Sequence, residues 1–197
     1  MKLTIAPSLS ILALLLAAGT TAALPPEAEQ DEARWRDITL FAQRFDPPPE
    51  NWLRIDDQRG KLSFSMPCEA HQREMTTGDV EVKVYSCHVG ERVYQVMVGI
   101  APHVNEPEWL DGYWLGQERG MVRRFEELGA TVTVRPRLRV AYEGGLSGRQ
   151  STLDLGTRQM EVRCLAGKHL IITLMLMDSK EKAQGNLYDF FNSLRLD

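Results

Sequence analysis

The stretch that decides the fold is RVYQVMVGIA, which spans residues 92–101. A strand with one face in water alternates apolar with polar side chains, whereas a strand covered on both faces is apolar in both phases. Apolar residues occupy both phases here, for example Val93 in one phase and Val96 and Val98 in the other. We therefore expect a central strand with a layer packed against each of its faces.

Strand signals surround this stretch on both sides. Before it, residues 61–66 and 80–85 alternate apolar with polar side chains, and the polar segment 69–79 between them is expected to be a turn. After it, further strands are expected at residues 130–141, 148–155, 158–165 and 169–177. Because the connections between consecutive strands are short, the pattern predicts a largely antiparallel sheet of six or seven strands.

Two helices are expected to flank the sheet. Residues 108–128 carry apolar side chains at helical spacing and are followed by Gly129, which favours helix termination. The second helix is expected to begin at Asp178, with Glu181 completing a capping box, and to run to Leu194. The sequence therefore predicts an α+β fold, a three-layer α/β/α sandwich with helices on both faces of the sheet.

The N-terminus carries the pattern of a secretory signal peptide. Lys2 is followed by an apolar run centred on residues 11–18 and then by small residues, and cleavage is expected after Ala23, with Ala22 as the alternative. Residues 24–51 then form an N-terminal arm, and residues 52–197 are expected to fold as a single domain. The protein is therefore predicted to be periplasmic or secreted.

The N-terminal arm has an apolar stripe of its own at helical spacing. Its members are Trp35, Ile38, Leu40, Phe41 and Phe45. A helix here has to end before residues 47–49, because three consecutive prolines remove backbone donors and disfavour the helical conformation of the preceding residue. The arm is thus expected to be partly helical and to join the domain through a stiff turn.

Charge and hydropathy restrict the class of partner. The chain has a formal net charge of -4 and its basic residues are not clustered, whereas nucleic-acid binding needs clustered positive charge. After the signal peptide, the longest apolar stretch is residues 170–177, well short of the roughly 20 apolar residues of a membrane span. We expect no nucleic-acid binding and no membrane span in the mature chain.

Three cysteines, Cys68, Cys87 and Cys164, allow one disulfide in an oxidising compartment. If residues 61–66 and 80–85 formed a hairpin, Cys68 and Cys87 would lie at opposite ends of paired strands, roughly 20 Å apart at about 3.3 Å per residue. This distance favours a disulfide that includes Cys164. The sequence therefore leaves two alternatives open, one disulfide among the three cysteines or three reduced thiols, and it does not fix the partners.

Three short motifs stand out, GKLSFSMP at residues 60–67, GLSGR at residues 145–149 and FFNSLRL at residues 190–196. They resemble landmarks of a group of small exported bacterial proteins with the PsbP-like fold. Together they cover the chain from about Trp52 to its end, and the fold is shared by the PsbP and Mog families. The resemblance implies a fold and a binding or accessory role without a shared active site. Cys68 and the N-terminal arm depart from the pattern.

The sequence shows no recognisable catalytic, metal or cofactor constellation. The nucleophile elbow G-x-S-x-G is lacking. The four histidines, His71, His88, His103 and His169, stand singly rather than at the spacing of metal ligands. We therefore expect no catalytic residue, no metal and no cofactor.

Aromatic residues form the candidate binding patch. Trp109 and Tyr113 are expected to lie partly exposed at the start of the first helix, whereas the phase of Trp114 places it in the core. Aromatic side chains concentrate binding energy at protein interfaces. The leading hypothesis is an exported non-enzymatic binding or accessory module of the bacterial cell envelope, whose partner is an envelope protein or a small apolar ligand. The alternative is an envelope hydrolase or transferase with a dispersed active site.

Overall fold

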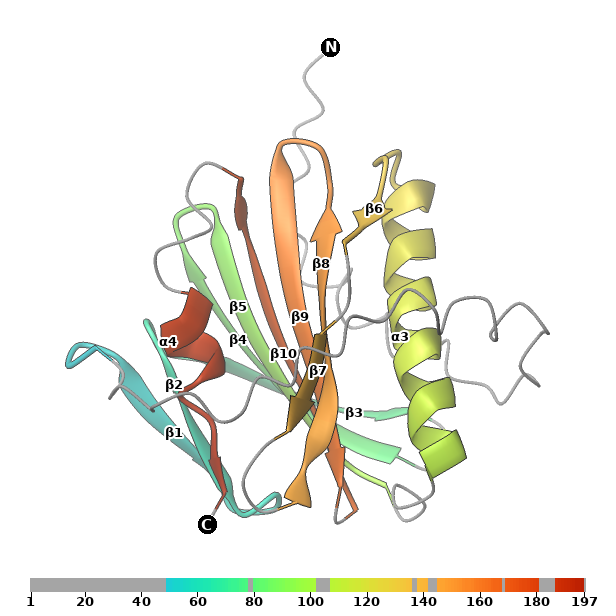
Figure 1. Ribbon diagram of the computed structural model, residues 1–197. Coiled ribbons are helices and arrows are strands. Elements are labelled where there is room, and N and C mark those ends of the chain that lie inside the picture. The colour runs from blue at the N-terminus through green and yellow to red at the C-terminus, as the bar shows by residue number, and fades with distance from the viewer. Residues whose placement is uncertain are drawn as a thin grey trace.

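The computed structural model describes residues 49–77, 80–101, 107–135, 138–141, 145–167, 169–180 and 187–196. The signal peptide and residues 24–48 of the N-terminal arm lie outside this described part. Figure 1 shows a large twisted sheet with the long helix α3 along one side and a smaller sheet on the other. No helix of the described part is long and apolar enough to cross a membrane.

Eight strands form the main sheet of the described residues, and every pairing in it is antiparallel. In spatial order they are β3 (His71–Thr77), β4 (Val80–Val89), β5 (Arg92–Ile100), β10 (Leu170–Ser179), β9 (Arg158–Gly167), β8 (Ser147–Asp154) and β6 (Thr133–Val134), and β7 (Leu138–Ala141) also pairs with β8. The strand β5 lies between β4 and β10, with buried side chains in both phases. The prediction of a central strand at residues 92–101 is therefore confirmed.

A second, three-stranded sheet consists of β1 (Leu53–Asp57), β2 (Leu62–Met66) and β11 (Arg195–Leu196). Both of its pairings, β1 with β2 and β2 with β11, are antiparallel. Residues 62–66 therefore form a strand as predicted, but this strand pairs with β1 and β11 and not with residues 80–85.

The helix α3 (Pro107–Glu127) covers one face of the main sheet, which confirms the helix predicted at residues 108–128. Met121 is buried, and Trp114, Val122 and Phe125 pack beside it. The sheet side of this core contains buried apolar residues from five strands, namely Val82, Val84, Met97, Leu153, Met160, Val162, Cys164 and Met175.

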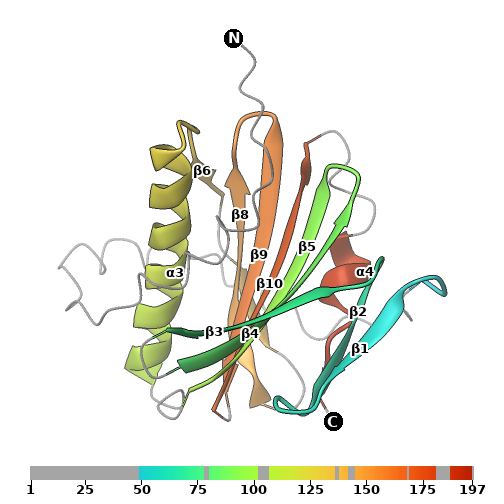
Figure 2. The same cartoon turned by 180° about the vertical axis from the view of Figure 1, so that it is seen from behind.

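The opposite face is covered by the three-stranded sheet and by the short helix α4 (Leu187–Phe191), as the reverse view in Figure 2 also shows. Phe64 of β2 packs edge-on against Tyr85 of β4, with ring centroids 5.1 Å apart, and the fully buried Phe190 of α4 packs against Tyr94 of β5. The fold is thus mostly antiparallel sheet with few helices. Much of the layer expected to be helical is formed by β1, β2 and β11, because their apolar side chains cover this face.

The polar segment after β2 corrects the prediction of a turn at residues 69–79. Residues 71–77 form β3, which pairs with β4 so that His71 lies opposite Ser86. An edge strand lies partly in solvent and often carries charged side chains, so a polar segment without apolar alternation can form one. The residues that begin β3 are exposed, which is why the alternation pattern did not reveal this strand.

The position of β3 also decides the disulfide. Because His71 pairs with Ser86, the chain just before β3 lies beside the end of β4, and Cys68 forms a disulfide with Cys87 over a Cα–Cα distance of 5.9 Å. The preference for a pair that includes Cys164 is therefore wrong. Cys164 is a buried free thiol.

Asp178 does not begin a helix. It lies in the last part of β10, where its carboxylate accepts a hydrogen bond from the Arg92 guanidinium of β5. An ion pair to a neighbouring strand replaces the predicted role in helix capping, and the strand continues to Ser179. Glu181, the second residue of the predicted capping box, lies outside the described residues.

Candidate functional site

The motif GLSGR sets the geometry between β8 and β9. Gly145 has a φ of 79°, in the left-handed region that favours glycine. At Gly148 an added Cβ would lie 1.9 Å from the carbonyl oxygen of Cys164, so only glycine allows this approach of the two backbones. The motif therefore has a structural basis, and it delivers the next residue, Arg149, to the face of the sheet under α3.

Arg149 stacks on an aromatic ring of α3. Its guanidinium carbon lies 5.0 Å from the centroid of the Trp114 ring, within the range of a cation–π contact. The contact joins β8 to α3. The same contact places a positive charge at the edge of a hollow between the two elements.

The hollow between α3 and the main sheet, called the α3 hollow below, is small, with a volume of about 20 Å³, which is room for about one water-sized group. Four of its lining residues come from α3, two from β8 and two from β9, namely Trp114, Leu115, Glu118, Met121, Arg149, Ser151, Val162 and Cys164. The lining is mostly apolar, with a few polar groups among the apolar ones.

Two polar groups of the α3 hollow differ in how they are paired. The Ser151 hydroxyl donates a 2.8 Å hydrogen bond to the buried carboxylate of Glu118. The indole Nε1 of Trp114 is buried, and it has no hydrogen-bond acceptor among the described residues. A buried donor without an acceptor costs about 1–3 kcal/mol. Trp114, a residue that lines the hollow, therefore carries a buried donor without an acceptor in the described part of the chain.

Cys164 closes the hollow from the β9 side as a protonated thiol. Burial raises its pKa to about 12, and the Thr173 hydroxyl lies 3.8 Å from its sulfur. A nucleophilic cysteine needs a lowered pKa and access to solvent. Cys164 therefore contributes apolar surface to the hollow and is not suited to nucleophilic catalysis.

The two residues of the predicted aromatic patch lie at the start of α3. Tyr113 is half-buried, packs against Ala101, Ala166 and Ile171 of the sheet, and has a buried hydroxyl whose pKa burial raises. The backbone of Trp109 belongs to α3, and its side chain lies outside the described part. The structure therefore brings Tyr113 toward the sheet, and the patch itself stays a prediction.

Sequence reasoning missed the α3 hollow because its residues come from three separate elements. Trp114 was assigned to the core from its helical phase, and Glu118 and Ser151 carried no signal at all. The available signal was Arg149, a charged residue directly after a glycine that the sheet requires.

A buried polar network lies on the other face of β8 and β9. The Glu161 carboxylate accepts hydrogen bonds from Thr152 at 2.6 Å and from the side-chain amides of Gln159 and Gln150 at 2.7 and 3.4 Å. Burial nevertheless raises the pKa of Glu161. Arg163 donates to Gln150 and to a backbone carbonyl of α4. Because these groups satisfy one another, the network joins α4 to the sheet.

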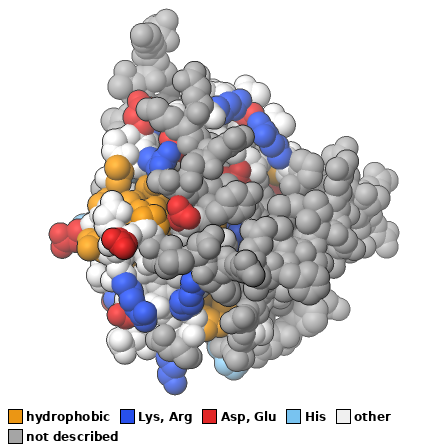
Figure 3. All heavy atoms as spheres, turned by 60° about the vertical axis from the view of Figure 1, so that its left-hand side comes forward, with side chains coloured by type: hydrophobic (Ala, Val, Ile, Leu, Met, Phe, Trp, Pro, Cys, Tyr) orange, Lys and Arg blue, Asp and Glu red, His pale blue; other side chains and the backbone are white. Residues whose placement is uncertain are grey.

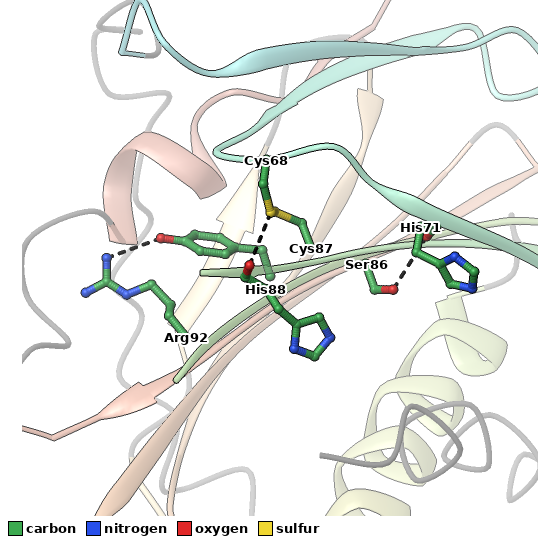
Figure 4. The surroundings of a disulfide bond; sticks show 7 residues. Cys68, His71, Ser86, Cys87, His88 and Arg92 are labelled. Atoms are coloured by element: carbon green, nitrogen blue, oxygen red, sulfur yellow. Dashed lines mark hydrogen bonds between the residues drawn. A yellow bond between two sulfur atoms is a disulfide. The ribbon is translucent and has the colours of Figure 1, made fainter. Parts of the chain in front are cut away.

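The disulfide end of the domain is shown in Figure 4. Cys68 and Cys87 connect the end of β2 with β4, and Arg92 donates a 3.2 Å hydrogen bond to the hydroxyl of Tyr94 beside them. The imidazoles of His71 and His88 point away from the disulfide. Within the described residues, no group of three or more His, Cys, Asp or Glu side chains is arranged to hold a metal.

Comparison with known proteins identifies the fold. No family model matches the chain, and no curated protein matches it. Among solved structures, the chain is similar to cyanobacterial PsbP (CyanoP) from Synechocystis sp. PCC 6803, with a TM-score of 0.55 and 11% sequence identity over 76% of this chain and 94% of that chain. The chain therefore has a PsbP-like fold, as the three motifs implied. At this identity the likeness concerns the fold alone.

Proposed function

We propose that the chain is an exported non-enzymatic binding or accessory module of the bacterial cell envelope, and that it holds part of its partner in the α3 hollow. The observation that carries this proposal is the buried Nε1 of Trp114, which has no acceptor among the described residues. A partner that brings an acceptor oxygen to this nitrogen removes the cost of the unpaired donor. The free energy recovered in this way contributes to binding.

The lining of the α3 hollow indicates the chemistry of the partner group. Leu115, Met121 and Val162 offer apolar surface, and Arg149 holds a positive charge over the Trp114 ring. A carbonyl or carboxylate oxygen borne on an apolar group suits this combination, because an oxygen atom fits the small hollow and can accept from Trp114. A small apolar ligand or a side chain of an envelope protein can present such a group.

Two features support export to the envelope. The first residues have the pattern of a signal peptide, and the disulfide between Cys68 and Cys87 is typical of proteins in oxidising compartments. A binding role fits the protonated state of Cys164 better than catalysis by this thiol does.

The experiment that tests the proposal is affinity purification from the envelope fraction with tagged mature protein. Trp114→Phe keeps an aromatic ring under Arg149 and removes the indole N–H. Because one hydrogen bond contributes about 0.5–1.5 kcal/mol, we expect this variant to bind its partner about three- to tenfold more weakly. Co-purified proteins are identified by peptide mass spectrometry, and a retained small molecule by native mass spectrometry.

The matched control is Arg123→Ala, on the outer side of α3, where the arginine side chain is 83% exposed. This variant should retain the wild-type amount of partner. Equal retention by a folded Trp114→Phe protein would contradict a role of the hollow. A turnover activity lost with one titratable residue would replace the binding role by an enzymatic one.

A further inference from the structure

A second surface with a binding character lies far from the α3 hollow. Of the residues that the structure describes, the exposed large hydrophobic ones are Leu53, at 49% exposure, and Val89, at 47%. Single exposed apolar residues need no explanation, but neighbouring ones mark an interaction site. Together with the half-buried Trp52, they form what we call the disulfide-end patch.

Leu53 pairs with Met66, two residues before Cys68, and Cys68 is bonded to Cys87, so the two sheets bring the residues of the disulfide-end patch to one end of the domain. The Trp52 ring packs edge-on against Tyr94, with ring centroids 5.8 Å apart, and Tyr94 is the register partner of Cys87. Val89 follows Cys87 by two residues and therefore points to the same face of β4. Figure 3, which brings the side of β1 and β2 forward, shows hydrophobic side chains gathered on this side.

The patch lies on the face of the main sheet opposite to α3. Cys87 and Tyr94 belong to the core between the main sheet and the three-stranded sheet, and Trp52 packs against that core. The residues under α3 form a separate core on the other face. A segment bound at the disulfide-end patch therefore leaves the α3 hollow open.

The N-terminal arm enters the domain at this patch. The backbone N–H of Trp52 donates a 2.8 Å hydrogen bond to the carbonyl of Pro49, so the chain turns immediately before the patch. Residues 24–48 precede this turn and end within a few residues of Trp52 and Leu53. Attachment at this point gives the arm an effective concentration at the patch on the order of 1 mM, as for other short flexible tethers.

The arm also has the composition that such a surface binds. Its apolar stripe contains Trp35, Ile38, Phe41 and Phe45 at helical spacing, and an amphipathic helix needs an apolar surface to cover that stripe. We propose that the N-terminal arm docks on the disulfide-end patch of its own chain through this stripe. The docked arm covers Leu53 and Val89, and the α3 hollow stays free for the partner. This inference does not depend on the proposed function.

Site-specific photo-crosslinking of the full mature chain tests this proposal. A benzoylphenylalanine at Val89, an exposed position, is irradiated in a mixture of ¹⁵N-labelled and unlabelled protein. We expect cross-links to peptides within residues 27–48 of the same chain. The matched control carries the same photoreactive group at Glu126, an exposed position on α3, and should give no cross-link to the arm.

A second variant keeps the test decisive. Ile38→Asp together with Phe41→Asp removes two apolar side chains from the stripe without touching the described domain, and we expect the yield of the intrachain cross-link to fall about tenfold or more. Cross-links between labelled and unlabelled copies would show that the patch is an interface between two copies. The proposal would be overturned by such a cross-link between copies or by a cross-link to another protein. It would also be overturned if Val89 gave no cross-link in the folded protein.

Discussion

The Tyr85 hydroxyl donates a 2.6 Å hydrogen bond to the carboxylate of Asp57, and this bond joins β4 of the main sheet to β1 of the three-stranded sheet. Both side chains are buried. The second carboxylate oxygen of Asp57 accepts a 2.7 Å hydrogen bond from the backbone N–H of Gly60. Burial, followed by the bond to Asp57, raises the pKa of Tyr85, so its hydroxyl remains a donor at neutral pH.

Removing this hydroxyl should weaken the attachment of the three-stranded sheet. Tyr85→Phe leaves the buried carboxylate of Asp57 without one of its donors, and we expect a loss of about 1–3 kcal/mol in the free energy of unfolding, measured by denaturant titration. The control is Arg54→Ala, which removes an exposed ion pair with Asp56 and should cost less than about 1 kcal/mol. Similar effects of the two variants would show that the bond between the sheets contributes little.

Gly148 should tolerate no side chain. Because a Cβ there would lie 1.9 Å from the carbonyl oxygen of Cys164, Gly148→Ala forces β8 away from β9, and we expect a loss of about 3 kcal/mol or more, or failure to fold. Gly116→Ala is the matched control, because no atom lies within 4 Å of a Cβ at this position of α3. Alanine favours helix over glycine by about 1 kcal/mol, so this control should be neutral or stabilising. A stable Gly148→Ala protein would contradict the close approach of the two strands.

Thiol titration checks the disulfide. In denaturant without reductant, one thiol per chain, that of Cys164, should react with Ellman's reagent, and after reduction all three cysteines should react. In the native protein we expect very slow reaction, because Cys164 is buried and its pKa is raised to about 12. Peptide mapping of the unreduced protein should link Cys68 with Cys87. A linked peptide that contains Cys164 would contradict this pairing.

Glu161 should make stability depend on pH. Burial raises the pKa of Glu161 in the folded protein above its ordinary value of 4.5, so the folded state binds the proton more tightly than the unfolded state. Its contribution to the free energy of unfolding therefore falls as pH rises from the ordinary value to the folded value, and is constant beyond it.

Denaturant titrations of the wild type and of Glu161→Gln from about pH 4 to 8 measure this contribution, because glutamine does not titrate in the range where glutamate does. We expect the stability of the wild type relative to the variant to decrease with pH over that window. A relative stability that increases with pH would mean that the bonds from Thr152 and Gln159 outweigh burial.

The parts of the fold that the sequence predicted are those in which side-chain burial follows the backbone period. Residues 92–101 are apolar in both phases because β5 is covered on both faces, and α3 shows helical spacing because one of its faces packs on the sheet. The strand β3 was missed because its pairing rests on backbone hydrogen bonds to β4, which leave no pattern in an exposed polar segment. The disulfide was misplaced as a consequence, since the register of β3 sets the position of Cys68.

The candidate site was less accessible to sequence reasoning than the fold. The α3 hollow depends on the distance between a helix and two strands, and on the direction of the Trp114 indole. Neither quantity is encoded in the spacing of residues along the chain. The motif GLSGR marked the neighbourhood of the site, but the role of Arg149 followed only from its position over the Trp114 ring.

The ¹H–¹⁵N resonance of the Trp114 indole in labelled mature protein tests the proposed binding role most directly. The resonance is assigned through Trp114→Phe and followed while an extract of the cell envelope is added. If the α3 hollow binds a partner, this resonance should shift or broaden selectively, because its N–H acquires an acceptor, while the Trp52 indole on the opposite face stays unchanged. An unmoved Trp114 resonance, together with a change at Trp109, would assign binding to the start of α3 and contradict a role of the hollow.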